Sequence, residues 1–144
     1  MLKQIIGLYQ LITGLFGFIF VLASALLNQN LAMMRLVQGQ VFAGVILFGL
    51  LAWTGWGVLN STNKSIGYSK VLQSLQIFSF SISGTLYKFS AGAFISFGYA
   101  NGGLIKHFSL MPIDFALASG TDNSFSLVIY LVPLLILIAL IKIK

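Results

Sequence analysis

Cysteine and glutamate are both missing from this sequence of 144 residues, and its acidic side chains are two aspartates. Without cysteine the chain can form neither a disulfide framework nor a thiolate metal site. Charged residues amount to 7% of the chain, whereas a soluble globular domain carries about 25%. So little charge cannot cover the surface of a water-soluble domain, and we therefore expect a membrane protein.

Titratable groups that could support catalysis are almost absent. The candidates are His107, Asp114 and Asp122. A histidine and an aspartate can together relay protons or orient a nucleophilic serine. His107, however, follows Lys106 in a strand-like stretch, which is typical of a surface histidine. The spacing of the three residues indicates no metal site, and no phosphate-binding loop is present. The sequence therefore predicts a protein without enzymatic activity, cofactor or metal.

Apolar residues make up 58% of the chain, and they gather in three segments long enough to cross a bilayer, 5–27, 41–59 and 125–141. The shortest of them would span about 25 Å as a helix. Trp53 and Trp56 lie near the end of the second segment, where tryptophan is typical of the membrane interface. The short connection between the first two segments predicts an antiparallel helical hairpin.

Small residues are frequent in the first two apolar segments, and Gly14 and Gly44 lie near their middles. In lipid, small residues let two helix backbones approach closely, and dispersion then drives their association. We expect Gly14 and Gly44 to lie at helix–helix contacts, with a partner helix in this chain or in another protein.

In the middle of the chain, apolar residues alternate with serine over 78–83 and with lysine, serine and glycine over 87–99, where only Phe94 breaks the pattern. A period of two is typical of half-buried strands. A turn at 100–103 and two further strands, 104–110 and 113–118, follow from the same pattern and from the glycines. The aromatic residues of this region share one side of the predicted sheet: Phe78, Phe80, Tyr87, Phe89, Phe97 and Tyr99.

The expected fold is an integral membrane α+β protein. A transmembrane hairpin occupies 1–60, a small antiparallel β-rich module 61–123, and a third transmembrane helix 124–144. The alternative is an all-α protein with a fourth spanning helix over 75–100. That helix would bury Lys88 near the bilayer centre, at a cost of about 2.5–3.5 kcal/mol, and we therefore prefer the sheet.

The expected function is association. A β-rich module of this size is too small to bury a large core alone. We therefore expect those six residues to pack against a second copy, a partner protein, the membrane surface or the sheet folded on itself. The sequence predicts an accessory or assembly subunit that binds a larger membrane complex or itself. The alternative is an oligomeric pore or small transporter, in which Lys88 would favour anions.

The net charge of +6 comes from basic residues that are scattered singly. Phosphate contacts along a nucleic acid require a continuous basic stripe. We therefore expect the lipid bilayer, with its anionic headgroups, as the electrostatic partner, and no nucleic acid. The predicted location is a multi-pass position in a bacterial inner membrane, with the β-rich module on the extracytoplasmic side.

Overall fold

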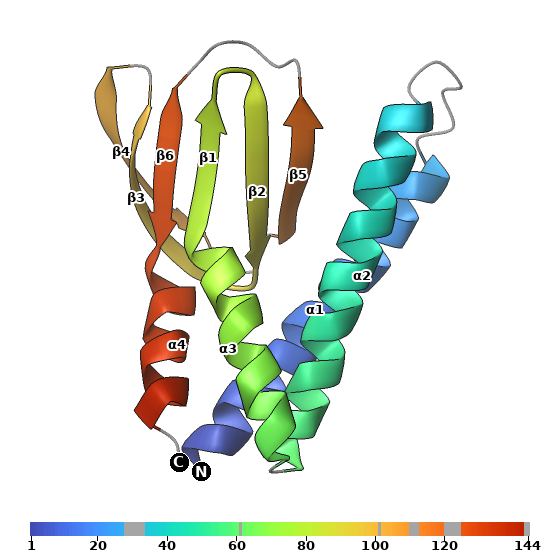
Figure 1. The fold of residues 1–144 in the computed structure, drawn as a ribbon, viewed down its shortest axis with the longest axis vertical. Coiled ribbons are helices and arrows are strands. Elements are labelled where there is room, and N and C mark those ends of the chain that lie inside the picture. Colours follow the sequence, from blue (N-terminus) through green and yellow to red (C-terminus); the bar gives the residue numbers. More distant parts are fainter. Residues whose placement is uncertain (28–33, 61, 101, 110–112, 120–124, 143–144) are drawn as a thin grey trace. The chain divides into compact units, whose positions relative to one another are not determined.

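The computed structural model describes residues 1–27, 34–60, 62–100, 102–109, 113–119 and 125–142. They contain the helices α1 (Leu2–Leu27), α2 (Met34–Leu59), α3 (Asn63–Ile77) and α4 (Leu131–Lys142). They also contain the strands β1 (Phe78–Ile82), β2 (Thr85–Ala91), β3 (Phe94–Ala100), β4 (Gly103–Ser109), β5 (Ile113–Ser119) and β6 (Ser126–Tyr130). The predicted α+β class is confirmed, and the all-α alternative is wrong because strands occupy most of 78–100 (Figure 1). The chain divides into two compact units, Met1–Ile66 and Gly67–Lys144.

The first unit is built on the antiparallel hairpin of α1 and α2 (Figure 1). Each helix has 26 residues, which corresponds to a length of about 39 Å. The two helices approach through small residues. A Cβ atom added to Gly14 would lie 2.8 Å from the Cα atom of Ala52, and one added to Gly7 would lie 2.8 Å from the backbone nitrogen of Leu59. Glycine is therefore required where the two backbones meet.

Two helices among the described residues are long and apolar enough to cross a membrane, Leu2–Leu27 and Gly39–Leu59. They correspond to the first two predicted spans. α4 is strongly apolar but has 12 residues, or about 18 Å of helix, which is shorter than a hydrocarbon core.

The third predicted span differs from the structure. The apolar run 125–141 forms strand β6 followed by helix α4. β6 pairs with β1 on one side and with β3 on the other, so its backbone bonds are made in the sheet. Pro133 is the third residue of α4. Proline is tolerated in the first turn, because the amide hydrogens there have no partner within the helix.

The β-rich module predicted for 61–123 begins with a helix, α3, that the sequence analysis did not anticipate. Its residues include lysine, serine and glutamine among the apolar ones, so no clear amphipathic period is visible. The Tyr87 hydroxyl of β2 donates a hydrogen bond of 2.8 Å to the Leu75 carbonyl near the end of α3. This bond ties the helix to the sheet that follows it.

The six strands form one antiparallel sheet in the order β4-β3-β6-β1-β2-β5. A tight turn joins β1 to β2, and its two residues Ser83 and Gly84 have φ angles of 50° and 79°. Two residues with positive φ are typical of a hairpin turn that matches strand twist. Gly102, with a φ angle of 85°, lies between β3 and β4, where the sequence predicts a turn.

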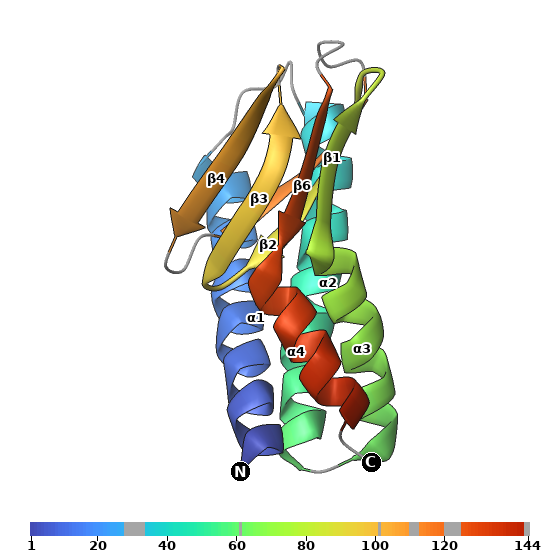
Figure 2. The same ribbon diagram turned by 90° about the vertical axis from the view of Figure 1, so that its left-hand side faces the viewer.

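The lengths of two connections require that the sheet curls. β4 and β5 are its opposite edges, and a flat sheet would hold them about 24 Å apart. Residues 110–112 alone separate Ser109 from Ile113, and a chain of that length reaches at most about 14 Å. Residues 92–93 likewise join β2 to β3 past two intervening strands. Figure 2 accordingly shows β3 and β4 in front of β2.

The strand register separates the side chains into two faces. The inner face is lined by small and polar residues, most of them buried: Ser79, Ser81, Ser90, Ser96, Gly98 and Tyr130. Eight strands leave an interior just wide enough to be filled by side chains, so a curled sheet of six strands leaves less room. Small side chains therefore fit inside, and the large apolar side chains lie outside.

Candidate functional site

The register places all six predicted aromatic residues on the outer face of the sheet. Phe78 and Phe97 lie on either side of Ile129, and Phe80 and Tyr99 lie on either side of Leu127. Tyr87 lies opposite Phe80 and therefore on the same face. Phe89, two residues further along β2, shares this face and lies opposite Phe115. The sheet therefore brings these residues onto one continuous surface, which we call the outer face. Their role in binding stays a prediction.

The six aromatic residues differ in exposure. Phe78, Phe97 and Tyr99 are 47%, 44% and 46% exposed. Phe89 is completely buried, and its ring packs edge-on against Phe115 at a centroid distance of 6.2 Å. Phe89 is thus a core residue. The three exposed aromatic residues lie on β1 and β3.

Tyr87 is the polar member of this set, and it is half-buried. Its ring lies 5.5 Å from that of Phe80, and its hydroxyl bonds to the Leu75 carbonyl. Burial raises the pKa of Tyr87, because the charged phenolate would be poorly solvated. The phenol therefore stays protonated near neutral pH and acts as a hydrogen-bond donor.

The outer face also includes exposed aliphatic and aromatic residues that the sequence analysis did not select: Ile82, Ile95, Leu104, Phe108, Leu117, Leu127 and Ile129. For the residues before β6, the alternation of apolar and polar side chains carried this signal. For Leu127 and Ile129 it was hidden, because the apolar run of β6 continues into α4.

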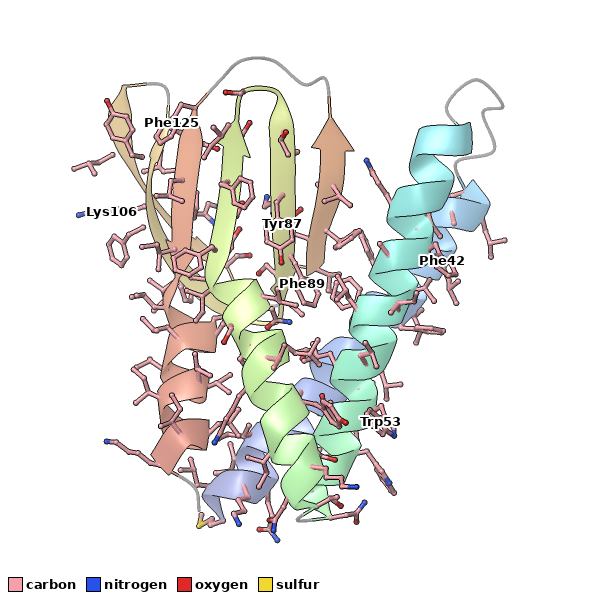
Figure 3. The ribbon with its side chains drawn as sticks, viewed as in Figure 1. Phe42, Trp53, Tyr87, Phe89, Lys106 and Phe125 are labelled. Atoms are coloured by element: carbon pink, nitrogen blue, oxygen red, sulfur yellow. The ribbon has the colours of Figure 1, made fainter. Side chains whose placement is uncertain are left out.

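The edge strand β4 has the most exposed side chains of the sheet. Its first six residues are exposed on both faces, and Leu104 and Phe108 of the outer face are 86% and 62% exposed. Lys106 lies between them, with its Nζ atom 6.0 Å from the centroid of the Phe97 ring. In Figure 3 its side chain points away from the strands. β4 thus combines an open edge with exposed apolar side chains.

Lys88 and Asp114 form an ion pair on the inner face. The register places Lys88 opposite Ala116 and Ser90 opposite Asp114. Both charged side chains are about one-third exposed, at 34% and 38%. The pair neutralises Lys88, the residue that the sequence analysis considered for a pore or relay.

Tyr130 of β6 lies near this pair on the inner face, where the charges of Lys88 and Asp114 act on its hydroxyl and Ser79 is its hydrogen-bond partner. His107 is exposed on β4, and its carbonyl accepts a long hydrogen bond of 3.5 Å from the Ser96 hydroxyl. Asp122 lies outside the described residues. Within 1–27, 34–60, 62–100, 102–109, 113–119 and 125–142, no three histidine or acidic side chains gather where they could hold a metal ion.

The two glycines selected from the sequence lie in the hairpin. Gly14 is buried on α1 where it meets Ala52 of α2. Gly44 is buried on α2. Gly7, Gly17 and Gly55 make similarly close approaches between the two helices. The helix partner of Gly14 is therefore found within the chain.

No protein-family model matches the chain, and no curated protein and no solved structure matches it either. The function must therefore be argued from the surfaces themselves.

Proposed function

We propose that this chain is an integral membrane protein without catalytic activity, and that it serves as an accessory or assembly subunit. It binds a larger membrane complex or further copies of itself. The predicted setting, a bacterial inner membrane, belongs to the same proposal. The hairpin of α1 and α2 anchors the protein, and the sheet provides the surface for association.

The hairpin suits the role of an anchor because its outward side chains are apolar along its length. Leu8, Phe16 and Ile19 are exposed on α1, and Phe42 and Trp53 are exposed on α2. Figure 3 shows Phe42 and Trp53 pointing away from the hairpin. Side chains of this kind are stable in contact with acyl chains, whereas water would disfavour them.

The observation that carries the proposal is the state of β4. An edge strand presents backbone N–H and C=O groups to which another strand can add. In β4 this edge is combined with exposed side chains on both faces, including Leu104 and Phe108. A strand contributed by a partner would pair with the edge and cover both side chains.

Site-specific cross-linking tests this proposal, and the cysteine-free chain allows one reporter at a time. The variant Leu104→Cys carries a photoactivatable cross-linker on the edge strand. The matched control is Ile82→Cys, which is also on the outer face and 44% exposed but lies on β1, between β2 and β6. We expect adducts in native membranes from Leu104→Cys, and at least several-fold fewer from the control.

Mass spectrometry of the adducts distinguishes a partner protein from a second copy of the chain. A chain that forms no adduct at position 104, and that stays at its own mass of 15.6 kDa in mild detergent, would contradict the proposal.

The oligomeric pore or transporter is less well supported. A charged path for anions would need an unbalanced cation, and Lys88 is paired with Asp114. Reconstituted liposomes decide between the two functions. Ion flux through the purified protein that changes selectivity in Lys88→Ala would favour the pore.

A further inference from the structure

The unit Gly67–Lys144 has the polarity of a protein in lipid, although it is not a simple helical anchor. Exposed apolar residues occur on the outer side of five strands rather than on one patch: Phe78 on β1, Ile95 and Phe97 on β3, Leu104 and Phe108 on β4, Leu117 on β5, and Leu127 and Ile129 on β6. Because the sheet is curled, these strands face in different directions. A protein partner would cover only the strands on one side of the curled sheet, whereas lipid can cover exposed strands that face in different directions.

The interior of the sheet is polar where a water-soluble domain would be apolar. Ser96 is 4% exposed, while its apolar neighbours on the outer face, Ile95 and Phe97, are 41% and 44% exposed. Ser90 is 1% exposed and lies between the buried residues Phe89 and Ala91. Hydrophobic side chains avoid water, and buried hydroxyls need partners. Around Ser96 the arrangement is therefore the reverse of what water as solvent favours.

Helix α3 shows the inversion in part, because it also buries Ile66, Leu72 and Ile77. Gln73 and Gln76 are each 1% exposed, and their side-chain nitrogens have no hydrogen-bond partner in the described part of the chain. Tyr68, Val71 and Leu75 are exposed instead, at positions along one side of the helix. A helix in water would turn its amides outward and its valine and leucine inward.

The stretch from the end of β6 through α4 has a length that suits a bilayer. α4 continues the line of β6 in Figure 2. From Ile129 to Lys142 the chain covers about 25 Å, as two strand residues and 12 helical residues. This length is close to the thickness of a hydrocarbon core.

Residues typical of an interface lie at both ends of that length. Lys142 ends α4. Tyr99 and Lys106 lie in the half of β3 and β4 that is nearer the β3–β4 turn, where tyrosine and a snorkelling lysine suit the headgroup level. Lys106 is the one charged residue on the outer face of the described strands. Asp114 is turned inward and paired with Lys88.

We propose that lipid acyl chains cover the outer face of the curled sheet below Tyr99, together with the exposed sides of α3 and α4. The unit Gly67–Lys144 is then seated in the bilayer and does not project from it as a water-exposed module. Lys106, which lies opposite Phe97 on β4, extends its side chain to the headgroup level. Water and phosphate there can satisfy the backbone groups of β4 next to the β3–β4 turn. This placement is independent of whether the chain has a protein partner.

Spin labels measure this directly, because each variant of the cysteine-free chain carries one label. The full chain is reconstituted, one copy per disc, in nanodiscs of phosphatidylcholine and phosphatidylglycerol. The test positions are Val71→Cys on α3, Ile129→Cys on β6 and Leu135→Cys on α4, which are all exposed on the protein. Leu15→Cys on α1 is the lipid-facing reference, and Ser96→Cys is the matched interior position.

We expect the labels at 71, 129 and 135 to behave as the label at 15 does. Collisions with oxygen, which dissolves in lipid, should exceed collisions with a water-soluble nickel complex by several-fold. The label at 96 should be protected from both. If Leu135→Cys loses the thermal transition of the parent chain, Ile138→Cys replaces it, because Ile138 is also exposed on α4.

Two results would overturn the proposal. Free access of the nickel complex at 71 and 129, with position 15 still in lipid, would place the unit in water. Protection from both reagents at 129 would show that protein covers the outer face. Neither result depends on the cross-linking at Leu104, so this inference and the proposed function can fail separately.

Discussion

The helical hairpin and the curled sheet both bury small or polar side chains and leave many large apolar ones exposed, but they do so by different means. In the hairpin, glycines let two helix backbones touch, as at Gly14 and Ala52. In the sheet, six strands curl so tightly that serines such as Ser90 and Ser96 fill the interior. The hairpin depends on contact between two backbones, and the sheet depends on a limit to interior volume.

This difference determines where each unit tolerates change. A helix pair can slide or separate when one side chain grows, because few connections hold the two helices in place. A sheet is held by backbone hydrogen bonds along every strand, so an oversized interior residue is opposed by the whole ladder. Substitutions at matched inner positions therefore probe the two mechanisms separately.

The largest effect is expected for Gly14→Leu in the hairpin. Even a Cβ atom at this position would meet the backbone of Ala52, so a leucine must push the helices apart. Overpacking of this kind costs about 3 kcal/mol of the free energy of unfolding. Thermal unfolding in mild detergent, followed by circular dichroism, measures the loss.

Gly39→Ala is the matched control, because nothing lies within 4 Å of a Cβ atom added there. It should leave the unfolding transition unchanged or raise it slightly, since alanine favours the helix more than glycine does. Equal behaviour of the two variants would mean that the hairpin does not pack through Gly14.

A smaller effect is expected for Ser90→Leu inside the curled sheet. Ser90 is 1% exposed, and its enlargement should cost about 1–3 kcal/mol of unfolding free energy. The matched outer variant is Ile129→Leu, which keeps the volume of an exposed side chain on β6. It should change stability by less than about 0.5 kcal/mol. A more destabilising outer variant would show that the two faces of the sheet are reversed.

The sequence predicted the sheet because apolar residues alternate with polar or small ones over 78–83 and, apart from Phe94, over 87–99, and a period of two is typical of strands. It could not predict β6. The run from Ser126 to Tyr130 is apolar on both sides, and such a run reads equally well as helix or strand. The decision came from pairing with β1 and β3, which are distant in sequence.

Helix α3 was missed for a related reason. Gln73 and Gln76 are buried while Val71 and Leu75 are exposed, so the usual rule that polar residues lie outside gives the wrong faces. The aromatic surface was predicted well, since alternation alone places its members on one side. The burial of Phe89 was not predicted, because it depends on its packing against Phe115 of β5.

A third prediction concerns the link between α3 and the sheet. Tyr87→Phe removes the hydrogen bond to the Leu75 carbonyl and keeps the ring contact with Phe80. The loss of one such bond should lower the free energy of unfolding by about 0.5–1.5 kcal/mol. Amide hydrogen exchange at the end of α3 should rise. Tyr99→Phe is the control, because Tyr99 is also on the outer face but is exposed.

The smallest effect is expected for the ion pair of the inner face. Lys88 and Asp114 are each about one-third exposed, so water screens their attraction, and such pairs contribute about 0.2–1 kcal/mol. A double-mutant cycle of Lys88→Met and Asp114→Asn measures the coupling. It should decrease when the salt concentration is raised, because mobile ions screen accessible charges. A coupling of several kcal/mol that is independent of salt would mean that the pair is sealed within the sheet. The interior of the sheet would then be closed to water, as the contact between α1 and α2 is at Gly14.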